Sequence, residues 1–151
     1  MIDSLFVLNS SGKIIIEKHW RGLINRQIVD YFNDQVSNQT SSEDVLPIIS
    51  TPKYQLVHVY RSGLTFLSPV TNEVDALLVL EFLHRIVDIL AEYFGEIAET
   101  SIKDNFDTVY QLLEEMMDYG KYNEFRLALE IKNLWYPLKL ITKIHRQGST
   151  A

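Results

Sequence analysis

The sequence predicts an α+β fold: a three-layer α/β/α sandwich with a five-stranded antiparallel sheet and the element order ββ-α-βββ-αα. Short runs of β-branched and aromatic residues alternate with turn residues, and three other segments repeat apolar side chains every three or four positions. The chain has 151 residues, of which 46% are hydrophobic. That length and apolar content suit one domain with one core.

The first elements are a β-hairpin and a helix. Residues 5–8 and 14–16 are β-rich runs, and the polar segment between them contains Gly12, which a tight turn needs. Apolar side chains at every fourth position from residue 24 to residue 36 predict an amphipathic helix. The polar, serine-rich residues 37–44 predict a surface loop.

Three further strands are expected at residues 45–49, 54–60 and 64–67. The turns between them are only about three residues long, which requires antiparallel neighbours because a parallel pair needs a long crossover. We expect Pro69 to end the sheet, since proline cannot donate a backbone hydrogen bond.

Two helices follow the sheet. The first is expected to begin at an Asn72 cap and to end at Gly95, and the second to run from Thr100 or Ser101 to Gly120. Residues 125–134 predict one more helix, and we expect Pro137 to interrupt it.

Charge and composition exclude several classes of function. The net charge of −6 argues against nucleic acid and direct lipid binding as main functions. The absence of cysteine excludes a thiolate site, and no signal peptide or membrane span is evident, which favours the cytoplasm. Twelve acidic residues stand against two basic ones between residues 71 and 120, whereas residues 121–151 hold six Lys or Arg and two Glu.

No set of residues in the sequence has the types and spacing of a known catalytic or metal-binding motif. Glu81 and His84 resemble half of a di-iron pair, but the other ligands are missing. Neighbouring carboxylates in the second helix lie outside its apolar face, as is typical of solvated side chains. We therefore predict a non-enzymatic protein without catalytic, cofactor-binding or metal-binding residues. These neighbouring carboxylates are Asp104, Asp107, Glu114 and Glu115.

Aromatic side chains supply the candidates for partner binding. Tyr and Trp combine a large apolar area with a polar atom, which suits protein interfaces. Of the many aromatic residues, we select Trp20, Tyr31, Tyr93 and Phe94 as partner-binding candidates.

Several segments resemble one family. The chain is similar to the longin-type N-terminal domain of clathrin-adaptor medium (mu) chains, and specifically to those of adaptor protein complex 3. The similarity covers about the first 120 residues. The segments that carry it are residues 1–12, 17–20, 30–32, 47–52, 81–85, 93–95, 102–105 and 109–118.

The resemblance implies a longin fold and a role in protein assembly. It implies a subunit held by a large beta-type chain, together with the other adaptor subunits, in a complex that sorts cargo from Golgi and endosomes toward lysosome-related organelles. The protein would then be cytoplasmic and peripheral on Golgi, endosomal and vesicle membranes through the complex.

We expect the likeness to end after Asp118. This divides the chain into a longin-like domain at residues 1–120 and a divergent basic tail at residues 121–151, without the signal-reading domain that mu chains carry. Two alternatives to an adaptor subunit remain. One is a free-standing longin regulator that competes for the large chain, and the other is a truncated product without cargo binding.

Overall fold

The computed structural model describes residues 2–39 and 45–120. These form two compact units, which we call the sheet unit, Ile2–Arg85, and the helical unit, which begins at Ile86. The boundary between them falls within one helix. The fold class and the order ββ-α-βββ followed by helices are as predicted.

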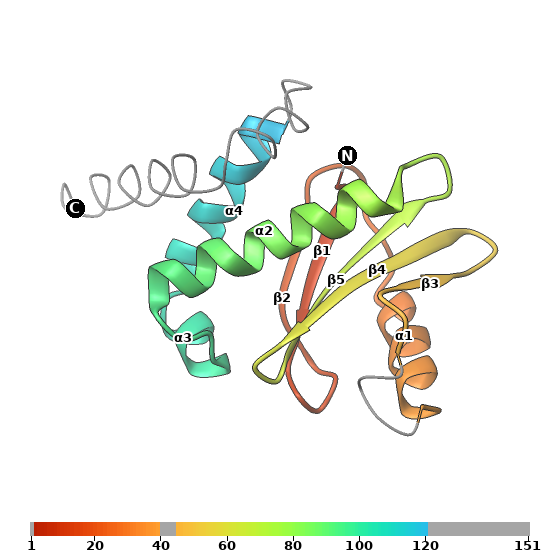
Figure 1. The fold of residues 1–151 in the computed structure, drawn as a ribbon, viewed down its shortest axis with the longest axis horizontal. Helices are drawn as coiled ribbons and strands as arrows, with labels where there is room; N and C mark the ends of the chain where they lie inside the picture. The colour runs from red at the N-terminus through yellow and green to blue at the C-terminus, as the bar shows by residue number, and fades with distance from the viewer. Residues whose placement is uncertain (1, 40–44, 121–151) are drawn as a thin grey trace. The chain divides into compact units, whose positions relative to one another are not determined.

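The sheet unit contains five antiparallel strands in the spatial order β2-β1-β5-β4-β3 (Figure 1). In this order β5 is the central strand, with β1 and β4 on either side of it, and β2 and β3 form the two edges of the sheet. The strands are β1 Ser4–Leu8, β2 Ile14–His19, β3 Ile48–Ser50, β4 Tyr54–Arg61 and β5 Leu64–Thr71.

Two tight turns follow directly from turn chemistry. Between β1 and β2, the Asn9 side-chain oxygen accepts hydrogen bonds from the backbone N–H groups of Ser11 and Lys13 at 2.9 and 3.0 Å. Between β4 and β5, Ser62 and Gly63 have φ angles of 55° and 82°. Positive φ at both central residues is typical of the type I′ turn, whose twist matches that of a hairpin.

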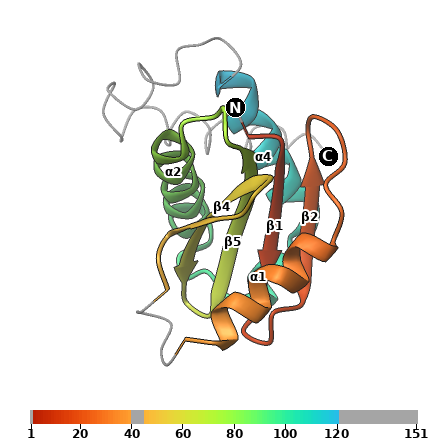
Figure 2. The same ribbon diagram turned by 90° about the vertical axis from the view of Figure 1, so that its right-hand side faces the viewer.

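Helix α1, Gln27–Ser37, lies across one face of the sheet (Figure 2). It begins three residues later than expected, where the Asn25 side-chain oxygen accepts from the Gln27 N–H at 3.0 Å. Its buried residues Val29 and Phe32 pack into a cluster with side chains from three strands. The strand members of that cluster are Phe6, Leu8, Leu56 and Leu67.

Pro69 does not end the sheet. It lies buried inside β5, opposite Leu56 of β4, so that prediction was wrong. The register of β1 and β5, extended by two residues, brings Pro69 opposite Ser4, whose carbonyl would normally receive a backbone N–H. The Ser68 hydroxyl donates to that carbonyl instead, at 2.8 Å. A side chain thus replaces the hydrogen bond that proline cannot make.

The later helices also differ in their bounds. Helix α2, Ala76–Phe94, begins four residues after Asn72, and the Asp75 carboxylate accepts from the Leu77 N–H at 3.0 Å. The predicted second helix is two helices, α3 Glu99–Asp104 and α4 Phe106–Gly120. The break lies at Asn105, whose φ and ψ of −123° and 37° are not helical and whose side chain donates to the Ser101 carbonyl.

Some predictions fall outside the described residues. These are the helix at residues 125–134, its interruption at Pro137 and most of the loop at residues 37–44. In the part of the chain that is described, no helix is long and apolar enough to cross a membrane.

Candidate functional site

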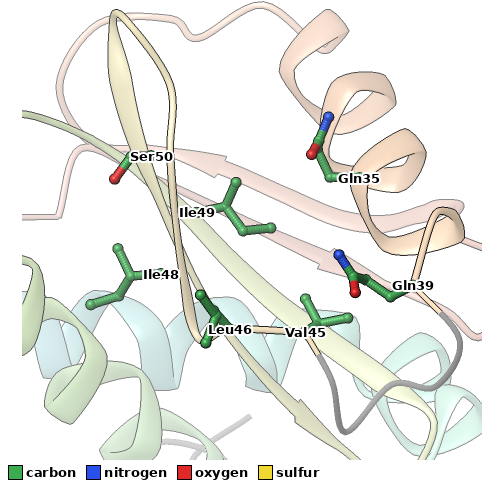
Figure 3. Close-up of a pocket in the computed structure, with 7 residues that line it drawn as sticks. All are labelled: Gln35, Gln39, Val45, Leu46, Ile48, Ile49 and Ser50. Atoms are coloured by element: carbon green, nitrogen blue, oxygen red, sulfur yellow. The ribbon is translucent and has the colours of Figure 1, made fainter.

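A groove of about 570 Å³ lies between α1 and the short edge strand β3 (Figure 3). Gln35 of α1 and Gln39, two residues after its end, line one side, and residues of β3 and the segment before it line the other (Figure 3). The lining residues from that second side are Val45, Leu46, Ile48, Ile49 and Ser50.

The chemistry of this groove suits a neutral peptide. None of its described lining residues is charged, and Leu46 is 72% exposed. Because β3 stands at the edge of the sheet, one row of its backbone groups has no neighbouring strand among the described residues. Such an edge can pair with an added strand from another protein. We therefore consider the groove a candidate protein-binding site.

The four aromatic candidates fall in two places. Trp20 and Tyr31 belong to the sheet unit, and Tyr93 and Phe94 to the helical unit. Tyr31 is 40% exposed, whereas Trp20 is half-buried with Lys18 above its ring. Tyr93 and Phe94 pack edge to face, with ring centroids 4.9 Å apart. Their role in binding stays a prediction.

A serine, a histidine and a carboxylate form a hydrogen-bonded chain at the end of the first hairpin. The Ser4 hydroxyl contacts His19 Nδ1 at 2.6 Å, and His19 Nε2 contacts Glu17 at 3.0 Å. Arg26 donates to the same carboxylate through Nε at 2.8 Å. The bond from Arg26 holds the pKa of Glu17 below its usual value, and His19 adds to this, while partial burial opposes it.

This chain of residues resembles a catalytic triad only in composition. Ser4 is fully buried, so its hydroxyl cannot meet a substrate. His19 and Glu17 instead connect β2 to Ser4 of β1 and to Arg26 at the start of α1. The network therefore links β1, β2 and the start of α1.

A buried histidine, His58, lies beneath α1. The ring of His58 packs edge to face against Phe32, with centroids 4.8 Å apart, and its Nδ1 has no hydrogen-bond partner among the described residues. Burial lowers the pKa of His58, and a hydrogen bond with the backbone of Leu56 partly offsets this. The ring is therefore neutral in the folded protein near pH 7.

The residues considered for metal or acid–base chemistry lie on the surface. Glu81 and His84 are both exposed, as are Asp104 and Asp107. Among the described residues, no group of three or more His, Asp or Glu is arranged to hold a metal ion.

The groove was not predicted from the sequence. Residues 45–49 were expected to form a regular strand, but β3 contains only Ile48–Ser50, which leaves Leu46 outside it and exposed. The apolar pair Val45 and Leu46, directly after the polar loop, is the local signal of this surface.

The structure describes an α+β domain with a candidate protein-binding groove, and comparison with known proteins gives its family. The chain matches the model of the clathrin adaptor complex small chain over residues 1–134 and belongs to that family. The family is non-enzymatic, which agrees with the buried serine and the exposed acidic residues.

Mu subunits of AP-3 complexes are among the similar curated proteins. The chain is 44% identical over 147 residues to AP-3 complex subunit mu-1 of Gallus gallus, covering 95% of this chain and 34% of that one. It is 47% identical over 130 residues to AP-3 complex subunit mu-2 of Homo sapiens, covering 86% of this chain and 30% of that one. The chain is thus related to AP-3 mu subunits and spans about a third of their length.

The likeness extends further than expected. Both the family match and these alignments continue past Asp118, where we had expected the similarity to end. Among solved structures, a chain of the "homology model of the full-length AP-3 complex in a stretched open conformation" matches with a TM-score of 0.72 at 15% identity. The match covers 100% of this chain and 95% of that one, and at this identity it shows the fold alone.

Proposed function

We propose that this chain is a protein-binding subunit, or a fragment of one, in an AP-3-type adaptor complex that acts in vesicle-mediated transport from Golgi and endosomes toward lysosome-related organelles. The observation that carries the proposal is the 44% identity to AP-3 complex subunit mu-1 over 95% of the chain. The protein works in the cytoplasm and reaches membranes only through the other subunits.

The partner in this proposal is the large beta-type chain of the complex. The α1–β3 groove, whose described lining is uncharged, supports a role in protein contact. Covering the exposed Leu46 removes apolar surface from water, and β3 has only one neighbouring strand among the described residues. Burying one leucine side chain stabilises a complex by roughly 1.5–3 kcal/mol, enough to change affinity more than tenfold.

The test is coexpression with the large beta-type chain of an AP-3 complex, followed by size-exclusion chromatography. We expect one stable one-to-one complex, and none with the large chain of a different adaptor complex. A well-folded chain that elutes alone in both cases would contradict the proposal.

Two leucine substitutions test whether the groove contacts the large chain. Leu46→Asp should weaken the complex at least about tenfold, since it places a charge where an apolar side chain was covered. Leu77→Asp is the matched control, because Leu77 is similarly exposed, at 64%, but lies on α2 outside the groove. Equal affinities of the two variants would remove the groove from the interface and leave the assembly proposal intact.

A further inference from the structure

A second hollow, of about 480 Å³, lies at the end of α1 and shares no lining residue with the α1–β3 groove. Three segments line it: the turn between β1 and β2, the second half of α1, and the ends of β4 and β5 that contain Tyr60 and Thr65. Figure 2 shows these segments together at one end of the sheet. We call this the α1-end hollow. Its volume falls within the range of about 300–1,000 Å³ that is typical of ligand sites.

Hydrogen bonds fix two walls of the α1-end hollow. The Asn9 side chain accepts from the backbone N–H groups of Ser11 and Lys13 and holds the turn in shape. The Asn33 side chain donates to the Gly12 carbonyl at 2.9 Å and connects this turn to α1. A ligand that binds here therefore does not have to order these walls, which lowers the entropic cost of binding.

The charge of the α1-end hollow favours a cation. Asp34, an exposed residue in the last turn of α1, is the only charged residue among the described residues that line the hollow. The C-terminal end of a helix carries a partial negative charge, so an acidic side chain there is unfavourable and a cation is favourable. The last turn of α1 contains no basic residue that would offset this. A bound cation therefore relieves an unfavourable arrangement within the fold.

Tyr60 adds an aromatic face to the same hollow, and it is 55% exposed although it belongs to β4. Ser10, Ser11 and Thr65, whose hydroxyls can accept hydrogen bonds, are also among the lining residues. Cations bind over aromatic rings, and arginine does so more often than lysine. The planar guanidinium of arginine can also donate two parallel hydrogen bonds to one carboxylate, which the ammonium of lysine does not do.

We propose that the α1-end hollow binds an arginine side chain of a partner protein segment, with the guanidinium between the Asp34 carboxylate and the Tyr60 ring. Leu8 and Val36 supply apolar lining that the alkyl part of the arginine covers. The lining hydroxyls accept hydrogen bonds from the remaining N–H groups. This contact is separate from the α1–β3 groove and does not depend on assembly with the large chain.

Heteronuclear NMR titration of the full chain with the peptide acetyl-Gly-Arg-Gly-amide tests this binding. We expect the backbone amide signals of Ser10, Ser11 and Thr65 to shift, with a dissociation constant in the millimolar range, because one exposed ion pair and one ring contribute little free energy. The same peptide with citrulline in place of arginine keeps the shape without the charge, and it should bind about three- to fivefold more weakly. Equal affinity for the two peptides, or no shift at these residues, overturns the proposal.

Two substitutions with matched controls test the named residues. Asp34→Asn and Tyr60→Leu should each weaken binding of the arginine peptide about three- to fivefold. Asp30→Asn and Tyr31→Leu change the same residue types at exposed positions of α1 that do not line the hollow, so the affinity should stay nearly unchanged. Asp34→Asn should also leave the urea midpoint unchanged or raise it, because it removes an acidic group from the C-terminal end of a helix. A lower midpoint, or equal affinities of Asp34→Asn and Asp30→Asn, would overturn the role of Asp34 and with it the proposal.

Discussion

Gly12 of the first hairpin lies in close contact with Asn33 of α1, and we call this contact the interlock. Gly12→Ala tests how much the interlock contributes to stability. Gly12 has a φ of +81°, and the Asn33 side chain donates to its carbonyl at 2.9 Å. A Cβ added at Gly12 would lie 2.8 Å from the Asn33 amide atoms. Asn33 must therefore move, and moving it breaks the hydrogen bond that it makes.

The cost has two parts. A non-glycine residue in the left-handed region costs ~1–2 kcal/mol, and loss of the half-buried hydrogen bond costs about 0.5–1.5 kcal/mol. Together they predict that Gly12→Ala lowers the free energy of unfolding by roughly 1.5–3.5 kcal/mol. Urea denaturation followed by circular dichroism measures this directly.

A control and a double-mutant cycle isolate the steric part. Gly63 has nearly the same φ, +82°, but nothing lies within 4 Å of its Cβ position, so Gly63→Ala should show only the backbone cost. In an Asn33→Ala background, the cost of Gly12→Ala should fall to that of Gly63→Ala. If Gly12→Ala costs no more than Gly63→Ala, or costs as much without Asn33 as with it, the interlock does not exist.

Three further predictions concern buried and paired polar groups. Because burial lowers the pKa of His58, its protonation favours the unfolded chain, so stability should fall as the pH drops below about 6.5, and His58→Gln should flatten this dependence in urea midpoints. Ser68→Ala removes the donor to the Ser4 carbonyl and should lower the free energy of unfolding by about 1–3 kcal/mol in the same assay. Arg26→Gln should raise the pKa of Glu17 toward its usual value in an NMR titration, and the stability that Glu17 contributes above its unfolded pKa should decrease.

For each of these three predictions, one experimental result would contradict it. A wild-type urea midpoint that changes with pH no more than that of His58→Gln would mean that another group controls the dependence. Ser50→Ala, at an exposed serine, should change stability by less than about 0.5 kcal/mol, and an equal effect of Ser68→Ala would contradict the role of Ser68 beside Pro69. An unchanged Glu17 titration in Arg26→Gln would exclude Arg26 as the main cause of the lowered pKa.

Local patterns were enough to predict the element order. The three hairpins depend on turn residues next to each other in the chain, and the helices depend on apolar spacing within one segment. Both are decided within a few residues, so they can be recognised without knowing what lies nearby in space. The resemblance to adaptor mu chains also rested on contiguous segments, and the relatives that are 44% and 47% identical confirmed it. The helix bounds and the break at Asn105 were missed although local side-chain caps decide them.

The other errors arose where distant residues decide the outcome. Pro69 stays inside β5 because Ser68 supplies a hydrogen bond to a residue 64 positions away, and no local rule for proline includes that partner. The Ser4–His19 bond and the groove beside Leu46 likewise depend on which strands and helices become neighbours. The sequence by itself therefore determined the fold class, the order of the strands and helices, and the family. Only the tertiary structure decided register, polar pairing and exposed surfaces, because each needs groups that are far apart in the chain to meet.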